Sequence, residues 1–162
     1  MIIFQPLKSY EIEDLLESDA FTVDQFLGVY SSEKLPVVYR LPSAFIWNTD
    51  DSSRRGEHWV AVYFNSLGHA CYFDPLGLPP LWQTWENYLR DNSNKGQWFY
   101  TTKTVQNPLS STCGYHCILY VLYRCRGFSA QNVLKLYSSN LDENDVFVVD
   151  AVHKLLSPGV IN

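Results

Sequence analysis

The stretch Gln106-Asn-Pro-Leu-Ser-Ser-Thr-Cys-Gly-Tyr-His-Cys117 passes directly into the apolar run Ile118-Leu-Tyr-Val-Leu-Tyr123. A polar loop that contains a proline therefore ends at Cys113, and the apolar run predicts a buried helix from there to about residue 126, with a glycine at 127 to end it. Backbone N–H groups and the helix dipole favour negative charge at a helix start. A thiol in this position should ionise readily, and a thiolate is a nucleophile. The pattern makes Cys113 the candidate nucleophile of the chain.

Two neighbouring strands supply a candidate base and its partner. His58 opens an apolar segment that runs to residue 65, a turn is predicted at 66–68, and the returning strand closes at Asp74. Because a tight hairpin brings its open ends together, residue 58 should lie beside residues 74–76. A carboxylate there can accept a hydrogen bond from the histidine Nδ1–H and stabilise the imidazolium. We therefore expect an ion pair between His58 and Cys113, with Asp74 orienting the ring.

Gln106 lies seven positions before Cys113, at the end of a predicted strand. If the intervening loop folds back, the Gln106 side-chain amide and the Cys113 backbone N–H point at one spot. Two such donors would form an oxyanion hole, which stabilises the negative oxygen of a tetrahedral intermediate. Gly114, next to the nucleophile, would let a substrate backbone approach closely.

The rest of the chain predicts one α+β domain over residues 1–162. An antiparallel-rich mixed sheet is expected, with the Cys113 helix packed centrally against it. Two sets of segments carry the prediction: strands at 43–48, 58–65, 69–74 and 97–105, and helices at 10–27, 81–89, 129–138 and 142–156.

Bulk composition excludes several classes of function. Apolar residues make up 46% and charged residues 18% of 162 residues, which is a globular composition, and the net charge is −5. An acidic chain without a long basic run argues against strong nucleic-acid binding. No signal peptide or membrane-spanning run is present, and three of the four cysteines fall on one predicted helix, a poor geometry for disulfides. We expect an intracellular monomer in a reducing compartment, neither secreted nor bound to a membrane.

The motifs together resemble the adenovirus endopeptidase (adenain) family, within the wider clan of SUMO-protease-like cysteine proteases. The similar elements are Gly56-Glu-His-Trp59, Tyr72-Phe-Asp-Pro-Leu-Gly77 and Gln106 to Gly114, with a further likeness at Phe26–Tyr30. The resemblance implies the adenain-like fold, His58 as base, Asp74 as the orienting acid, Cys113 as nucleophile and Gln106 as oxyanion donor. It also implies cleavage of viral or mobile-element precursor proteins near Gly or other small residues, as in virion maturation. The candidate substrate-binding residues are Gly56, Glu57, Trp59 and Gly114.

Three departures from the adenoviral pattern modify these expectations. The acid is Asp74, as in the wider clan, where adenoviral members have Glu. The acidic net charge argues against stimulation by DNA. No cysteine lies between Cys71 and Cys113, so an activating peptide, if one is used, lacks the disulfide tether of the family. The chain is expected to act in the host nucleus or cytoplasm, or inside a virion, and to need no cofactor.

Other interpretations of the same residues remain open at this stage. Cys113, His116 and Cys117 could ligate zinc with Cys71 or His69, although the spacing lacks the usual paired knuckles. A degenerate protease fold could serve as a binding module. Among enzymes, the alternative is an isopeptidase that removes ubiquitin or SUMO. Trp59 can either pack in the core or wall a substrate groove.

Overall fold

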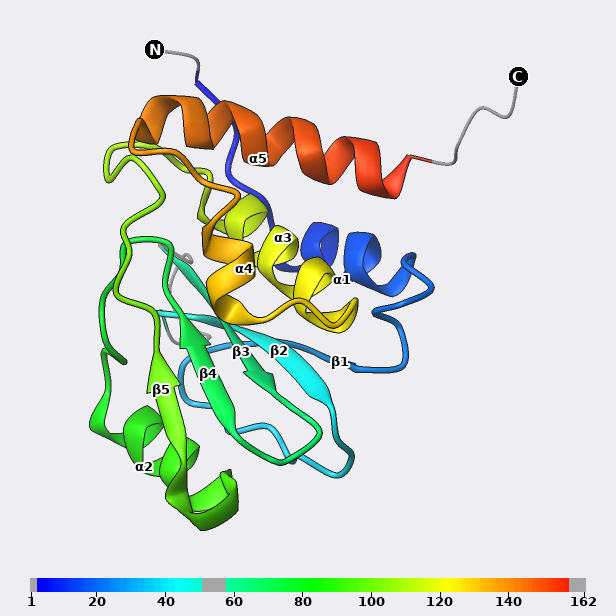
Figure 1. The fold of residues 1–162 in the computed structure, drawn as a ribbon, viewed down its shortest axis with the longest axis vertical. Helices are drawn as coiled ribbons and strands as arrows, with labels where there is room; N and C mark the ends of the chain where they lie inside the picture. Colours follow the sequence, from blue (N-terminus) through cyan, green and yellow to red (C-terminus); the bar gives the residue numbers. More distant parts are fainter. Residues whose placement is uncertain (1–2, 51–57, 158–162) are drawn as a thin grey trace.

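The apolar segments predicted as strands form the middle of a five-stranded sheet in the computed structural model, which describes residues 3–50 and 58–157 (Figure 1). Every residue of β2 (Ser43–Asn48), β3 (Trp59–Phe64) and β4 (Ala70–Phe73) is buried, as expected for strands covered on both faces. β1 (Phe26–Tyr30) and β5 (Trp98–Tyr100) form the edges, and the strand order is β1-β2-β3-β4-β5. The two central pairs are antiparallel and the two outer pairs are parallel.

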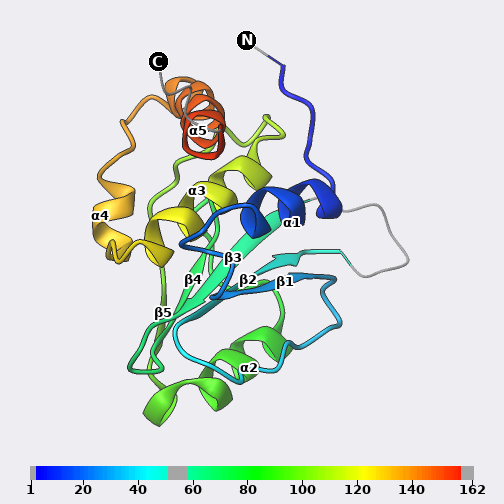
Figure 2. The same ribbon diagram turned by 90° about the vertical axis from the view of Figure 1, so that its right-hand side faces the viewer.

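Helices cover both faces of the sheet (Figure 2). One face carries α1 (Ser9–Glu17), α3 (Cys113–Cys125), α4 (Ala130–Leu134) and α5 (Leu141–Leu156), over the larger of two apolar clusters. The other face carries α2 (Gln83–Asn92), followed by a short 3₁₀ turn at Asn94–Gly96, over a second cluster rich in aromatic rings. The α+β fold class is therefore confirmed, with α3 as the central helix.

Three predicted elements were wrong in extent. The helix expected over residues 129–138 ends at Leu134. The helix expected over residues 10–27 ends at Glu17, and Phe26–Tyr30 forms the edge strand β1. A five-residue strand with an internal glycine has little local preference for extension, so its pairing with β2 decides its conformation. The strand expected over 97–105 ends at Tyr100, because the following residues turn toward the end of β4: Val105 N–H donates to the Pro75 carbonyl at 2.8 Å.

None of the helices within the described ranges has the length and apolar run needed to cross a bilayer.

Candidate active site

The β3–β4 hairpin brings its open ends together in the predicted register. Ala61 pairs with Phe73, which aligns the start of β3 with the residues just after β4. The turn at the closed end is tight, since Gly68 N–H donates to the Asn65 carbonyl at 2.9 Å. His58 immediately precedes β3 and Asp74 immediately follows β4, so the hairpin places a base beside an acid.

His58 and Asp74 form a direct ion pair. The imidazole Nε2 lies 2.7 Å from Asp74 Oδ1, and the same oxygen accepts the Leu76 backbone N–H at 2.8 Å. The expectation of an Nδ1 contact was wrong, because Nε2 makes the contact with the carboxylate. Nδ1 is consequently the nitrogen left to face the Cys113 thiol.

The surroundings of His58 favour its protonated form. Burial lowers the pKa of His58, but hydrogen bonds with Asp74 and Cys113, together with the negative charges of both groups, outweigh burial and raise the pKa to about 9. Asp74 is only 5% exposed, so solvent screens this pair weakly. An imidazolium held at neutral pH beside a thiol is the electrostatic setting in which a thiolate is stable.

Cys113 is the first residue of α3 and is 5% exposed. Its helix packs on β3, and His58 immediately precedes that strand. This packing brings the start of α3 toward His58, although the two residues are 55 positions apart in the sequence. Thr112 occupies the N-cap position of α3, and its side chain makes no capping hydrogen bond to the helix. The first turn of the helix therefore keeps its N–H dipoles directed toward the thiol.

Gln106 lies at the base of the loop that leads into α3. It is 2% exposed, and its backbone N–H donates to the Pro75 carbonyl at 3.2 Å, which ties it to the residue after Asp74. Its side-chain Nε2 donates to the Ser110 carbonyl at 3.1 Å. The same Nε2 also lies 3.4 Å from the Ser110 hydroxyl, so both hydrogen-bond contacts of this nitrogen are with Ser110 and the role of Gln106 as oxyanion donor stays a prediction.

The predicted substrate-binding residues fall into three groups. Gly56 and Glu57 lie outside the described residues. Trp59 is 9% exposed within the apolar core, and its Nε1–H donates to the Leu7 carbonyl at 3.2 Å. A Cβ on Gly114 would meet Leu7 Cβ at 3.2 Å and Trp59 Cδ1 at 3.3 Å. The missing side chain of Gly114 thus makes room for the N-terminal segment, so a substrate contact there stays a prediction.

Gly77 closes the turn that carries Asp74. Its N–H donates to the Asp74 carbonyl at 2.8 Å, its φ is +73°, and a Cβ would lie 2.6 Å from the Thr102 carbonyl oxygen. No side chain fits that contact without moving the backbone. The Asp-Pro-x-Gly motif therefore has a physical reason: glycine lets the turn after β4 pack against the 101–106 segment.

Replacing Gly77 with alanine should lower the free energy of unfolding by roughly 2–4 kcal/mol, from left-handed strain plus the backbone clash. Gly127→Ala is the matched control: its φ is +92°, but nothing lies within 4 Å of the added Cβ. The control should cost only about 1 kcal/mol, the strain alone. Urea denaturation of both variants measures the difference, and equal losses would show that the contact with Thr102 is unimportant.

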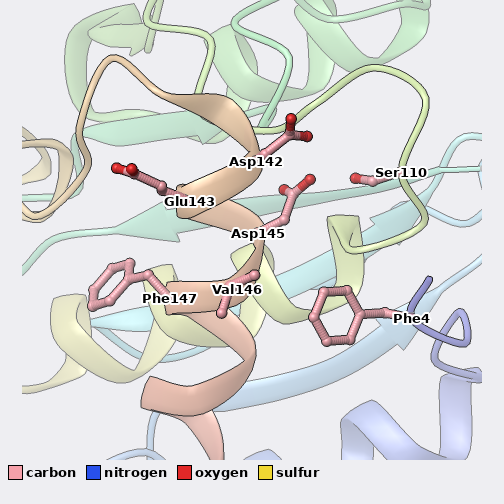
Figure 3. A pocket seen from close by; sticks show the side chains of 7 residues that line it. All are labelled: Phe4, Ser110, Asp142, Glu143, Asp145, Val146 and Phe147. Carbon is pink, nitrogen blue, oxygen red and sulfur yellow. The ribbon is translucent and has the colours of Figure 1, made fainter. Parts of the chain in front are cut away.

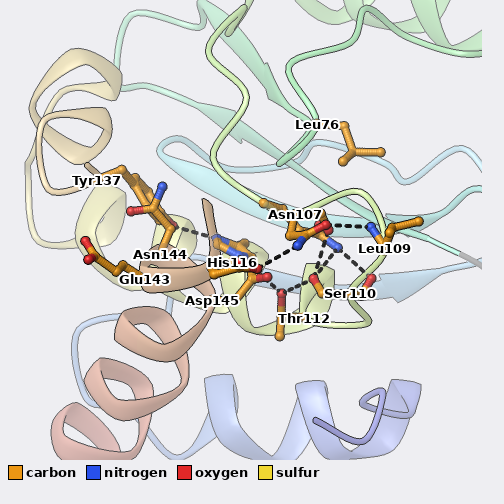
Figure 4. Close-up of polar contacts among 12 residues, drawn as sticks. Leu76, Asn107, Leu109, Ser110, Thr112, His116, Tyr137, Glu143, Asn144 and Asp145 are labelled. Atoms are coloured by element: carbon orange, nitrogen blue, oxygen red, sulfur yellow. Dashed lines mark hydrogen bonds and ion pairs between the residues drawn. The ribbon is translucent and has the colours of Figure 1, made fainter. Parts of the chain in front are cut away.

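Sequence reasoning missed a buried polar cluster that includes Thr112, the residue before Cys113 (Figure 4). Asp145 Oδ1 accepts Thr112 Oγ1–H at 2.8 Å and lies 2.9 Å from His116 Nε2, while His116 Nδ1 lies 3.1 Å from the Tyr137 hydroxyl. His116 lies on α3 and Asp145 on α5, while Thr112 and Tyr137 lie in the segments that precede these two helices. A histidine within an apolar helical run was the only signal in the sequence, and it gave no partner.

The same contacts weigh against the zinc interpretation. Both ring nitrogens of His116 are engaged, and all four cysteines are free and buried. Within residues 3–50 and 58–157, no group of three or more His, Cys, Asp and Glu side chains is placed to hold a metal ion.

A cavity of about 530 Å³ opens on the α5 side of the loop before Cys113 (Figure 3). Seven residues from the N-terminal segment, this loop and α5 line it: Phe4, Ser110, Asp142, Glu143, Asp145, Val146 and Phe147. It contains none of the four predicted catalytic residues. The cavity leaves one side of the loop before Cys113 without packed side chains against it.

The fold and the arrangement of these side chains define the class of adenain-like cysteine proteases. The adenovirus endoprotease family model matches residues 26–144, most of the chain. This protein therefore belongs to the adenovirus endoprotease family.

Two adenovirus proteases are similar in sequence. The protease of human adenovirus A serotype 12 is 32% identical over 110 residues, and that of human adenovirus B serotype 3 is 30% identical over 109 residues. Each alignment covers 60% of this chain, and 50% and 49% of the respective relatives. The aligned part thus spans about half the length of the curated relatives.

Two solved structures share the fold at low sequence identity. The ASFV pS273R protease superposes with a TM-score of 0.62 at 17% identity, covering 95% of this chain and 69% of the other. The central domain of the uncharacterized Lpg1148 protein from Legionella pneumophila gives a TM-score of 0.54 at 13% identity, covering 94% and 99%.

Proposed function

We propose that this protein is a cysteine endopeptidase that cleaves viral or mobile-element precursor proteins next to Gly or other small residues. One observation carries the proposal: the His58–Asp74 pair at 2.7 Å, in which the pKa of His58 is raised to about 9 by Asp74 and by the neighbouring Cys113 at the start of α3, against the lowering effect of burial. Membership of the adenovirus endoprotease family supports the same reaction.

In the proposed mechanism, the Cys113 thiolate attacks the scissile carbonyl carbon and a C–S bond forms. The carbonyl oxygen becomes negative and is stabilised by the Cys113 backbone N–H and the Gln106 amide. His58 gives its proton to the amide nitrogen as the C–N bond breaks, and the amine leaves. Water, deprotonated by His58, then attacks the thioester and releases the acid and the thiolate. Asp74 holds the imidazole at Nε2 throughout.

We propose that no disulfide-tethered activator is involved. Cys71 is 1% exposed within β4, Cys117 is fully buried, and Cys125 is 8% exposed, so none of them presents an accessible thiol to a peptide. Independence from DNA, the monomeric state and the absence of a cofactor stay predictions.

Digestion of a peptide library containing Gly at varied positions tests the proposal, with intact ubiquitin- and SUMO-type fusions as parallel substrates. We expect cleavage beside Gly in short peptides and little release of the folded modifiers. Efficient release of a modifier without peptide cleavage would favour the isopeptidase instead. No cleavage of either, with Cys113 still reactive toward iodoacetamide, would favour a binding module.

A further inference from the structure

Asp145 is a buried acid without a role in the mechanism above. It lies on α5, is 5% exposed, and its Oδ1 is held by Thr112 Oγ1 at 2.8 Å and His116 Nε2 at 2.9 Å (Figure 4). Thr112 and His116 are themselves fully buried. A carboxylate is costly to bury, and two hydrogen bonds offset that cost only while both donors stay in place. Asp145 therefore fixes the position of whatever carries those donors.

His116 acts as a support for Asp145 rather than as a second base. Burial lowers the pKa of His116, and this effect outweighs the hydrogen bond and charge of Asp145. The ring is therefore neutral, so that Nε2–H donates to Asp145 and Nδ1 accepts from the Tyr137 hydroxyl at 3.1 Å. With both nitrogens engaged, His116 has no site left for proton transfer with substrate.

Thr112 is the residue whose hydroxyl Asp145 holds. It occupies the N-cap of α3, where a threonine hydroxyl ordinarily accepts an N–H from the first turn of the helix. Here the hydroxyl donates to Asp145, and no side-chain cap is made. The N–H dipoles beside Cys113 thus remain available to a negative sulfur or oxyanion.

The network continues from Thr112 to the proposed oxyanion donor. Because Thr112 gives its hydroxyl proton to Asp145, its link to Ser110 Oγ at 2.9 Å uses the Ser110 proton, for which the Asn107 carbonyl at 3.0 Å is the alternative acceptor. Ser110 accepts Gln106 Nε2 at its carbonyl (3.1 Å) and its hydroxyl (3.4 Å). The loop between Gln106 and Thr112 has the 530 Å³ cavity on one side (Figure 3). Leu109 in this loop is 84% exposed. Hydrogen bonds, rather than apolar packing, hold this loop.

We propose that Asp145 is a positioning residue for the oxyanion hole: through Thr112 and Ser110 it keeps the Gln106 amide and the first turn of α3 in the geometry that stabilises the tetrahedral intermediate. The proposal rests on the proposed function. The proposal gives a residue of α5 a positioning role in catalysis, which the sequence of this helix does not suggest.

The test separates oxyanion stabilisation from nucleophile reactivity. Peptide turnover and binding of a peptide aldehyde both require an oxyanion, whereas alkylation of Cys113 by iodoacetamide does not. Asp145→Ala and Thr112→Val should each lower kcat about tenfold, less than the 10²–10³-fold typical of losing an oxyanion donor outright, with KM within about twofold. Aldehyde affinity should fall in parallel with kcat, and the alkylation rate should stay within about twofold of wild type.

Conservative variants and a matched control complete the design. Asp145→Asn and Thr112→Ser keep the oxygen and the hydroxyl, so they should recover most of the lost kcat. Asp150→Ala is the control, because Asp150 lies on the same helix but is exposed and pairs with Lys154 at 2.9 Å; it should behave as wild type. Gln106→Ala supplies the reference for a lost donor.

Two outcomes would overturn the inference: unchanged kcat in both disruptive variants, or alkylation that slows as much as turnover, which indicates general damage to the site. Thr112→Val is nearly isosteric, so it decides the question alone if Asp145→Ala does not fold. A wild-type protein that cleaves no peptide would refute the proposed function instead, and the two failures are therefore distinct.

Discussion

Cys113→Ala should abolish peptide cleavage, with a loss of about 10⁴-fold or more, while the protein remains folded. Removing the nucleophile of a catalytic set that acts as a unit removes nearly all the rate enhancement that the set provides. The fold should survive because Cys113 begins α3, alanine is a good helix former, and only one sulfur atom is lost. Initial rates on a cleaved peptide, with circular dichroism and a thermal melt, measure both halves of the expectation.

Cys117→Ala is the matched control for this variant. Cys117 lies one turn further along the same helix and is fully buried, and burial raises its pKa well above that of a free thiol. Its replacement should cost some stability but leave turnover within a few-fold of wild type. Loss of activity in Cys117→Ala equal to that in Cys113→Ala, or retained activity in Cys113→Ala, would contradict the assignment of the nucleophile.

Alkylation gives an independent readout of the same assignment. Burial raises the pKa of Cys71 and of Cys117, and raises that of Cys125 to about 11, so these three thiols should react slowly at neutral pH. One equivalent of iodoacetamide should therefore be incorporated rapidly by wild type and none by Cys113→Ala. Mass spectrometry of the labelled peptide identifies the site.

Asp74→Asn should lower kcat/KM by about 10³-fold at pH 8, somewhat less than the ~10⁴-fold loss that the corresponding change causes in a serine-protease triad. Asparagine keeps an oxygen that can accept the Leu76 N–H, so the turn after β4 should hold its shape. What is lost is the negative charge of Asp74, which helps to raise the pKa of His58 to about 9 against the lowering effect of burial. The neutral imidazole then no longer stabilises the Cys113 thiolate.

The pH profile distinguishes this electrostatic effect from misfolding. With a pKa of about 9, His58 is protonated at neutral pH, and the imidazolium is lost as the pH rises through about 9. Wild-type kcat/KM should therefore fall on the alkaline side near pH 9, and in Asp74→Asn this decline should move to lower pH. An unmoved alkaline decline, or wild-type activity in the variant, would remove Asp74 from the mechanism.

The positions of the candidate catalytic residues along the chain were predictable, because each one lies at the end of a strand or the start of a helix and local sequence patterns mark those boundaries. An alternation between apolar strands and a tight turn marks the hairpin that pairs His58 with Asp74. The change from a proline-containing loop to an apolar run marks the start of the helix at Cys113. Neither signal needs knowledge of distant contacts, and both elements occur where the sequence predicted them.

Edge strands and the support of the site were not predictable in the same way. Phe26–Tyr30 is a strand because β2 offers it a parallel partner, and Tyr100 ends β5 because the following segment turns toward Pro75. Asp145 is separated by more than thirty residues from Thr112, and nothing near it in the sequence suggests a buried acid. Its partners are visible only once α5 packs against α3.

By itself, the amino-acid sequence determined the order of the central elements and the positions of the candidate base, acid and thiol, because periodicity, turns and helix starts are local properties of a chain. Only the tertiary structure decided which imidazole nitrogen faces Asp74 and where the Gln106 amide is held. It also decided that the Thr112 hydroxyl donates to Asp145 and makes no cap on α3. Those choices depend on strand register and on helices packed across long sequence separations, where the hydrogen-bonding partner is chosen by proximity in space.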